Sequence, residues 1–229
     1  MDAQLPKTPE RPDASVFRAR QAQLEQVMAK HGVDCVLLNQ ATNIHYLTGV
    51  YNTCSWVFLK RDGQQIALVL ESDYPVYCRQ SSIGDIRIFR THDPLAHFRE
   101  LASELGLREN SLAVENEHLR HYQYEMIERF FGPLLFKGLF ADYIVQEARI
   151  KKTAEEIEKI RRASQLAVYG MKVAREMAAP GMTEEVLASL VRGAMIEAGA
   201  ARSTYIYVGS DARSSLAHTP ATDNLLNEG

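Results

Sequence analysis

In the first part of the chain, a helical pattern of apolar positions is followed by continuous apolar runs that are typical of strands. From residue 14 to 31 the apolar side chains recur at near-helical intervals and Gly32 follows as a stop, so a helix is predicted. The continuous apolar run VDCVLL, residues 33–38, predicts a buried strand. The runs SWVFLK and QIALVL flank Arg61-Asp62-Gly63, and an Asp-Gly pair between two such runs indicates a β-hairpin.

The next stretch alternates between strand-like and helix-like patterns. DIRIF and SLAVE are predicted to be strands, while LAHFRELASELG and HYQYEMIERFFG are predicted to be amphipathic helices. GLFADYIV is predicted to be a last extended piece. Strands mixed with helices in this way indicate an α/β domain.

After residue 148 the pattern becomes long, charged and helical. Thr153 with Glu156 forms a predicted capping box, followed by apolar positions at intervals of three and four. Pro180-Gly181 is expected to end this helix and Thr183 to cap a second one. STYIYVG is then predicted to be a strand that leads into a final loop.

These patterns divide the chain into three parts. Residues 1–13 contain three prolines and no periodicity, so we expect a flexible arm. Residues 14–147 form the predicted α/β domain, and residues 148–229 begin a second, helical domain.

Composition limits the classes of function. Of 229 residues, 46% are hydrophobic and 24% charged, and the net charge of −3 gives no basic field for nucleic acid or an anionic membrane. No apolar run is long enough to span a bilayer and the N-terminus lacks a signal-peptide core, so a cytoplasmic protein is predicted. Cys35, Cys54 and Cys78 lack the spacing of a zinc site and are predicted to be buried free thiols.

Three side chains are candidates for chemistry. His218 follows the last predicted strand, where an imidazole can stabilise a developing oxyanion, although a loop histidine can also be inert. Arg213 could clamp a substrate carboxylate or simply pair with Asp211. Trp56 lies in the predicted hairpin, where ordinary packing is the expected role from position alone. The acids near the C-terminus lie on one strand and loop, which leaves no recognisable metal site.

Three stretches, in order, carry a family resemblance. They are NIHYLTGV (residues 43–50), RIKKTAEEIEKIRRA (149–163) with PGMTEE (180–185), and the strand, Gly209 and loop that lead to His218. Together they resemble the pita-bread hydrolases, which include Xaa-Pro aminopeptidase, prolidase and creatinase. The resemblance implies a creatinase-like N-terminal domain, a mixed sheet with flanking helices, followed by an incomplete α+β pita-bread domain.

The same resemblance implies a function and a cofactor. A full-length enzyme of this kind is a metal-dependent Xaa-Pro peptidase with two divalent ions (Mn, Co or Zn), whose ligands would lie beyond Gly229. The chain as printed is therefore predicted to bind no metal and to be inactive. His218 matches the family's substrate-facing histidine. Trp56 matches a side chain that, in this family, reaches over the active site of a neighbouring subunit. The resemblance therefore predicts a homodimer that acts on proline-containing peptides.

Two alternatives remain open at this stage. One is a creatinase-type C–N hydrolase acting on a small amide or amidine, because such an enzyme uses a similarly placed histidine without metal. The other is a catalytically dead binding or dimerisation module.

Overall fold

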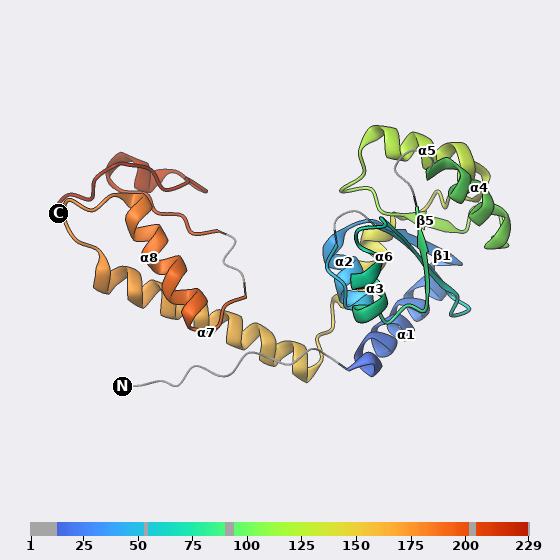
Figure 1. Ribbon diagram of the computed structural model, residues 1–229, viewed down its shortest axis with the longest axis horizontal. Coiled ribbons are helices and arrows are strands. Elements are labelled where there is room, and N and C mark those ends of the chain that lie inside the picture. The colour runs from blue at the N-terminus through green and yellow to red at the C-terminus, as the bar shows by residue number, and fades with distance from the viewer. Residues whose placement is uncertain (1–12, 53–54, 90–93, 202–204, 229) are drawn as a thin grey trace. The chain divides into compact units, whose positions relative to one another are not determined.

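The structure is a computed structural model that describes residues 13–52, 55–89, 94–201 and 205–228. It divides into two compact units, one built from Arg11–Lys151 and the other containing Lys152–Gly229 (Figure 1). Each unit is considered by itself below. No helix within the described ranges has both the length and the apolar character needed to cross a membrane.

A five-stranded mixed sheet organises the first unit. Its strands run in the spatial order β4-β3-β2-β1-β5. The consecutive strands β1, β2 and β3 pair antiparallel, whereas β5 joins β1 and β4 joins β3 in parallel. The bounds are β1 Cys35–Leu38, β2 Trp56–Lys60, β3 Gln65–Val69, β4 Asp85–Ile88 and β5 Leu112–Val114.

Helices cover both faces of this sheet, as Figure 1 shows. Because side chains alternate along a strand, Val36 and Leu38 pack with α1, α2 and α6, while Cys35 and Leu37 pack with α4 and α5. Two apolar clusters, one on each face, therefore form the core. The helices are α1 Ala14–His31, α2 Ala41–Thr48, α3 Tyr74–Gln80, α4 Pro94–Glu104, α5 His121–Phe131 and α6 Ala141–Arg149, with the 3-10 turn η1 Gly132–Leu134.

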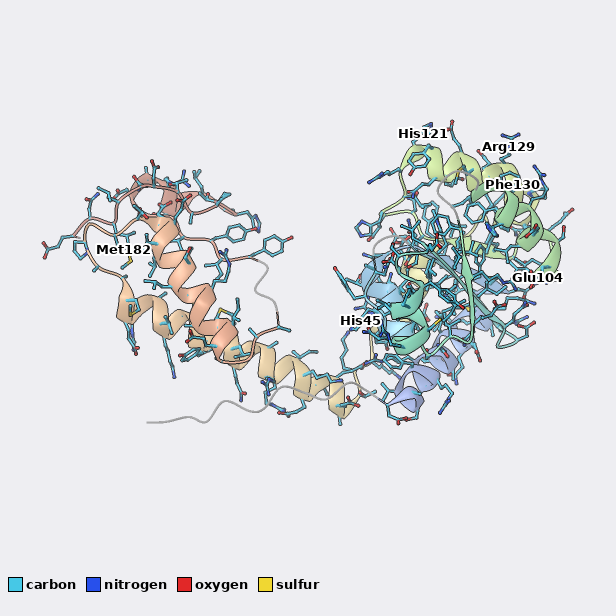
Figure 2. The ribbon with its side chains drawn as sticks, viewed as in Figure 1. His45, Glu104, His121, Arg129, Phe130 and Met182 are labelled. Atoms are coloured by element: carbon cyan, nitrogen blue, oxygen red, sulfur yellow. The ribbon has the colours of Figure 1, made fainter. Side chains whose placement is uncertain are left out.

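Local signals explain several element ends. Asp13 caps α1, and Gly32 ends it in the left-handed conformation. The predicted hairpin is confirmed, with Gly63 also at positive φ in the β2–β3 turn. Glu104, at the end of α4 (Figure 2), accepts two hydrogen bonds of 2.6 Å from Arg87 of β4 and so ties that helix to the sheet edge.

The second unit is a helical pair with an irregular C-terminal segment. Helix α7 spans Ala154–Met177 and α8 spans Glu184–Glu197; the short turn η2 covers Asp211–Ser215. The capping box of Thr153 and Glu156 is confirmed, because each side chain bonds the other's backbone N–H. Thr183 caps α8 as predicted, its hydroxyl accepting from the N–H of Val186.

Several local predictions are wrong. The piece GLFADYIV, predicted as extended, largely falls in helix α6. The apolar residues of this helix, Ile144, Val145 and Ala148, face the core at helical spacing. Most of NIHYLTGV, for which no element was predicted, forms helix α2. The described part of STYIYVG makes only one isolated bridge, Tyr207 to Pro220, instead of a strand.

The thiol prediction holds only in part. Cys35 is buried on β1, and burial raises its pKa well above the usual value. Cys78 is exposed, because it lies on the outer side of α3, a helix that the sequence reading missed. Cys54 lies outside the described residues.

Candidate functional site

The candidate site is built around a buried acid at the start of α8. Glu184 directly follows the capping residue Thr183, and its side chain is 0% exposed. A carboxylate at this end of a helix is favoured by the helix dipole. Its burial, however, requires that hydrogen-bond donors surround it.

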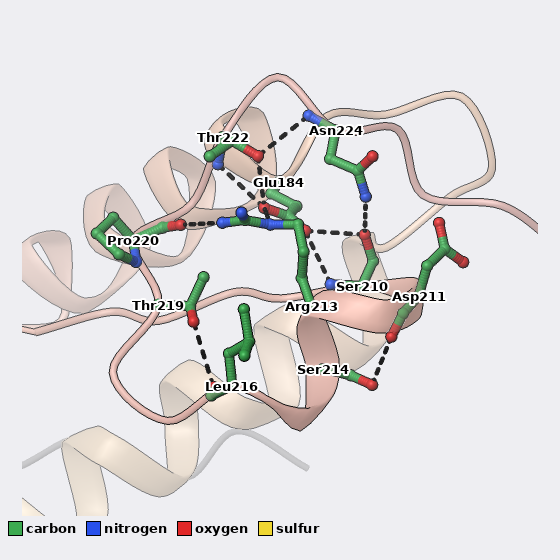
Figure 3. A network of polar contacts seen from close by, with 10 residues as sticks. All are labelled: Glu184, Ser210, Asp211, Arg213, Ser214, Leu216, Thr219, Pro220, Thr222 and Asn224. Atoms are coloured by element: carbon green, nitrogen blue, oxygen red, sulfur yellow. Dashed lines mark hydrogen bonds and ion pairs between the residues drawn. The ribbon is translucent and has the colours of Figure 1, made fainter.

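Those donors come from the C-terminal segment, as Figure 3 shows. Glu184 Oε1 accepts from the backbone N–H of Ser210 at 2.8 Å and from its hydroxyl at 2.9 Å. Glu184 Oε2 accepts from the N–H of Thr222 at 3.1 Å and from its hydroxyl at 2.9 Å. One carboxylate therefore holds both ends of the loop 210–222.

The network keeps this acid ionised. Burial by itself would raise the pKa of Glu184, but the hydrogen bonds donated by Ser210 and Thr222 oppose it and lower the pKa to about 2. The carboxylate is therefore negatively charged at neutral pH, and it accepts hydrogen bonds from both ends of the loop.

Arg213 lies within the same loop and completes the network. Its Nε is 3.3 Å from Glu184 Oε2, and its Nη2 donates to the carbonyl oxygen of Pro220 at 2.8 Å. The pairing that the sequence suggested, with Asp211, is replaced by the pairing with Glu184. Two of the donor nitrogens of Arg213 are thus used, one by Glu184 of α8 and one by Pro220 of the loop, and its role as a clamp for a substrate carboxylate stays a prediction.

His218 projects from the same loop. Its backbone has φ 56°, in the left-handed region, and the residue is exposed. Its ring meets the ring of Tyr207 edge to face, with centroids 5.5 Å apart. The structure therefore brings His218 and Arg213 into one loop and leaves His218 exposed to solvent.

Gly209 permits the close approach that this loop needs. A Cβ at this position would lie 2.9 Å from the carbonyl oxygen of Arg213. Since real Cβ atoms are not found so close to a backbone oxygen, any other residue would push the turn at Arg213 away from Glu184.

Trp56, the third candidate, belongs to the other unit. It begins β2, is 6% exposed, and packs edge to face on Phe98 of α4 with ring centroids 5.6 Å apart. This contact accounts for the residue as part of the core. Its proposed action on a neighbouring subunit's substrate stays a prediction.

The described ranges contain no group of three His, Cys, Asp or Glu side chains placed to hold a metal ion. The possible metal ligands after Gly199 in the sequence are Asp211, His218, Asp223 and Glu228, and all four are exposed. The residues described here therefore do not fit a two-metal centre.

Sequence reasoning missed Glu184. Its neighbour Glu185 is exposed, and nothing in the stretch PGMTEE distinguishes the two acids. No local signal identifies Glu184, because the groups that bind it, Ser210 and Thr222, lie far along the chain.

The stretch NIHYLTGV also has a structural explanation. Asn43 Nδ2 donates to Glu115 Oε1 at 2.7 Å, and Asn43 Oδ1 accepts from Arg149 at 2.7 Å. Glu115 Oε2 in turn accepts from the backbone N–H groups of Asn39 and Gln40. Asn43 of α2 is thus bonded both to Glu115, the residue that follows β5, and to Arg149 at the end of α6.

Comparison with known proteins agrees with this fold. Residues 20–162, more than half of the chain, match the family model described as the creatinase/prolidase N-terminal domain. The chain belongs to this family.

Individual relatives are peptidases by name. The chain is 26% identical over 218 residues to a Xaa-Pro dipeptidase of Pyrococcus furiosus, covering 93% of this chain and 58% of that protein. Among solved structures, the prolidase of Pyrococcus horikoshii OT3 aligns with a TM-score of 0.74 at 24% identity, over 92% of this chain and 58% of that one. A Xaa-Pro dipeptidase from Bacillus anthracis aligns with a TM-score of 0.79 at 20% identity, over 93% and 58%. At these identities the two structures support the fold alone.

Proposed function

We propose that this chain is part of a prolidase-family peptidase that hydrolyses the bond preceding proline. The observation that carries the proposal is the family match together with relatives that are named Xaa-Pro dipeptidases. The chain spans 58% of the length of the Pyrococcus furiosus relative, so the activity is proposed for the polypeptide that contains this chain.

In this proposal His218 donates a hydrogen bond to the substrate carbonyl as its oxygen becomes negative. The exposed ring and the loop that Glu184 holds at Ser210 and Thr222 support this role. Preorganised donors are effective because they need no rearrangement when charge develops. Arg213 and Trp56 are proposed to contact substrate, Trp56 across a homodimer.

A pair of divalent ions (Mn, Co or Zn) is part of the same proposal and would activate the attacking water. The residues described here do not supply its ligands. The contribution of this chain is therefore the histidine and the loop that presents it.

The test is hydrolysis by the polypeptide that contains this chain. We expect release of proline from Xaa-Pro dipeptides, loss of that activity with a chelator, and recovery with one of the three metals. His218→Ala should lower kcat by about 10²- to 10³-fold. The matched control is His121→Ala, which removes an imidazole that is 88% exposed at the start of α5 (Figure 2).

Other outcomes favour the rivals. Hydrolysis of creatine but not of Xaa-Pro dipeptides would support a creatinase-type enzyme. No hydrolysis of either substrate, combined with a stable dimer, would support the binding or dimerisation module.

A further inference from the structure

A cavity of about 580 Å³ opens in the first unit, at one edge of the sheet. Its lining includes Gln40 and Leu70, which follow the ends of β1 and β3, and Trp56, the first residue of β2. The beginnings of α2 and α5 close its sides. The carboxyl ends of strands in open α/β sheets are the usual place for ligands.

Aromatic rings form the apolar part of the lining. Trp56 and Phe89 are 6% and 9% exposed, whereas Tyr51 and Tyr122 are 47% and 52% exposed. Two rings are thus firmly packed, and two present a large part of their surface to solvent. Large exposed aromatic surface beside a cavity is available for contact with a ligand.

The polar part of the lining includes hydrogen-bond donors and no acid. Asn39, Gln40, Thr42, Ser55, His118, Arg120 and Gln123 contribute to it, and within the described residues no Asp or Glu does. The amide oxygen of Gln123 already accepts from the N–H of Arg120 at 2.9 Å, so its amino group is left to donate. The Arg120 guanidinium, which carries five donors, has no ion pair in the described part of the chain.

Exposed rings beside donors suit one kind of peptide. Proline residues present a rigid apolar ring, and their tertiary amides accept hydrogen bonds but donate none. Extended proline-containing segments accordingly dock on aromatic-lined grooves, with the rings on aromatic faces and the carbonyl oxygens on donors.

We propose that this cavity binds an extended, proline-containing peptide without cleaving it. The rings of Tyr51 and Tyr122 pack on proline rings, and Arg120 and Gln123 donate to the peptide carbonyl oxygens. The proposal shares with the proposed function only the proline-containing class of ligand. Its test measures binding and no hydrolysis, so either idea can fail alone.

Trp56 provides the measurement, because it is the single tryptophan of the chain and lines the cavity. The 229-residue chain is titrated with the blocked peptide acetyl-Ala-Pro-Pro-Ala-Pro-Ala-amide while tryptophan emission is recorded. The comparison peptide has alanine in place of each proline. We expect a saturable change with the first peptide and at least tenfold weaker binding of the second.

Two variants locate the site. Tyr122→Ala should weaken binding at least tenfold, and Arg120→Ala at least threefold. The matched control is Tyr143→Ala, which removes a tyrosine of similar exposure (54%) on α6, outside the cavity lining. The proposal is overturned if Trp56 emission does not respond, if both peptides bind equally, or if Tyr143→Ala weakens binding as much as Tyr122→Ala.

Discussion

The side-chain amide of Asn43 donates a 2.7 Å hydrogen bond to Glu115, and both residues are almost completely buried. The same amide accepts from Arg149, so one small polar side chain lies between a buried acid and a cation. The asparagine in the stretch NIHYLTGV therefore has a structural role, because its side chain makes these two contacts in the interior of the first unit.

Removing this amide should destabilise the chain. Asn43→Ala leaves Glu115 Oε1 without its donor. Because a buried acceptor that has lost its donor is also not hydrated by water, the free energy of unfolding should fall by about 2–3 kcal/mol. Urea unfolding measures the change. Asn116→Ala, which truncates an exposed asparagine on the same connection, should have little effect. Equal loss in the two variants would contradict this account.

Glu115 should make stability depend on pH. Burial raises its pKa to about 7, from a usual value of 4.5, and the negative charge of Asp142 adds to that rise, although hydrogen bonds from Asn43, Gln40 and Asn39 oppose it. Because the folded state holds the proton more tightly, this contribution to stability is complete below about pH 4.5 and is lost as the pH rises through 7.

The variant Glu115→Gln cannot lose a proton, so its free energy of unfolding should decline less between pH 5 and 7.5 than that of the natural chain. One group accounts for at most about 1.4 kcal/mol per pH unit. Glu109→Gln, at an exposed acid, should retain the natural decline. Parallel curves for the natural chain and Glu115→Gln would show that Glu115 does not titrate in this range.

Glu184 should protect two backbone amides. In Glu184→Gln the new amino group faces donors instead of accepting from them, so the N–H groups of Ser210 and Thr222 should exchange with solvent about tenfold faster. Because the pKa of Glu184 is lowered to about 2, its stabilising effect is present above pH 4.5 and is lost as the pH falls toward 2.

Hydrogen exchange at neutral pH checks this prediction. Glu185→Gln changes the exposed neighbouring acid and should leave both amides protected. Unchanged exchange in Glu184→Gln would mean that the loop 210–222 is held by other contacts.

Gly49 should resist substitution. Its φ of 85° is unfavourable for other residues, and an added Cβ would lie 2.8 Å from Cζ of the buried Phe17. Gly49→Ala should therefore lower the free energy of unfolding by about 2–4 kcal/mol, measured in urea. Gly84→Ala, with no atom within 4 Å of the new methyl group, is the matched control. A similar small effect in both would show that Phe17 can move aside.

The sequence predicted the elements whose signals are local. The Asp62-Gly63 turn and the caps at Thr153 and Thr183 follow from contacts within a few residues, and all three are confirmed. Helix α6 was missed because its nine residues resemble a strand until the core that they face is known.

The candidate site was predictable only in part. His218 was singled out through the family resemblance and Arg213 by its place in the same loop, and the roles of both stay predictions. Glu184 could not, because its role depends on Ser210 and Thr222, which lie 26 and 38 positions further along the chain. Long-range polar contacts of this kind leave no periodic pattern.

The sheet order has a consequence for synthesis of the protein. Strands β1, β2 and β3 are neighbours both in the chain and in the sheet, so they can pair as soon as they emerge from the ribosome. The other edge of β1 pairs with β5, where Cys35 faces Leu112, and that strand is made much later. Until then the apolar run CVLL presents an open edge, the kind of surface through which nascent chains associate wrongly. Several ribosomes on one messenger RNA bring such nascent chains close together, so the risk of aggregation should be greatest in the interval between the synthesis of β1 and that of β5.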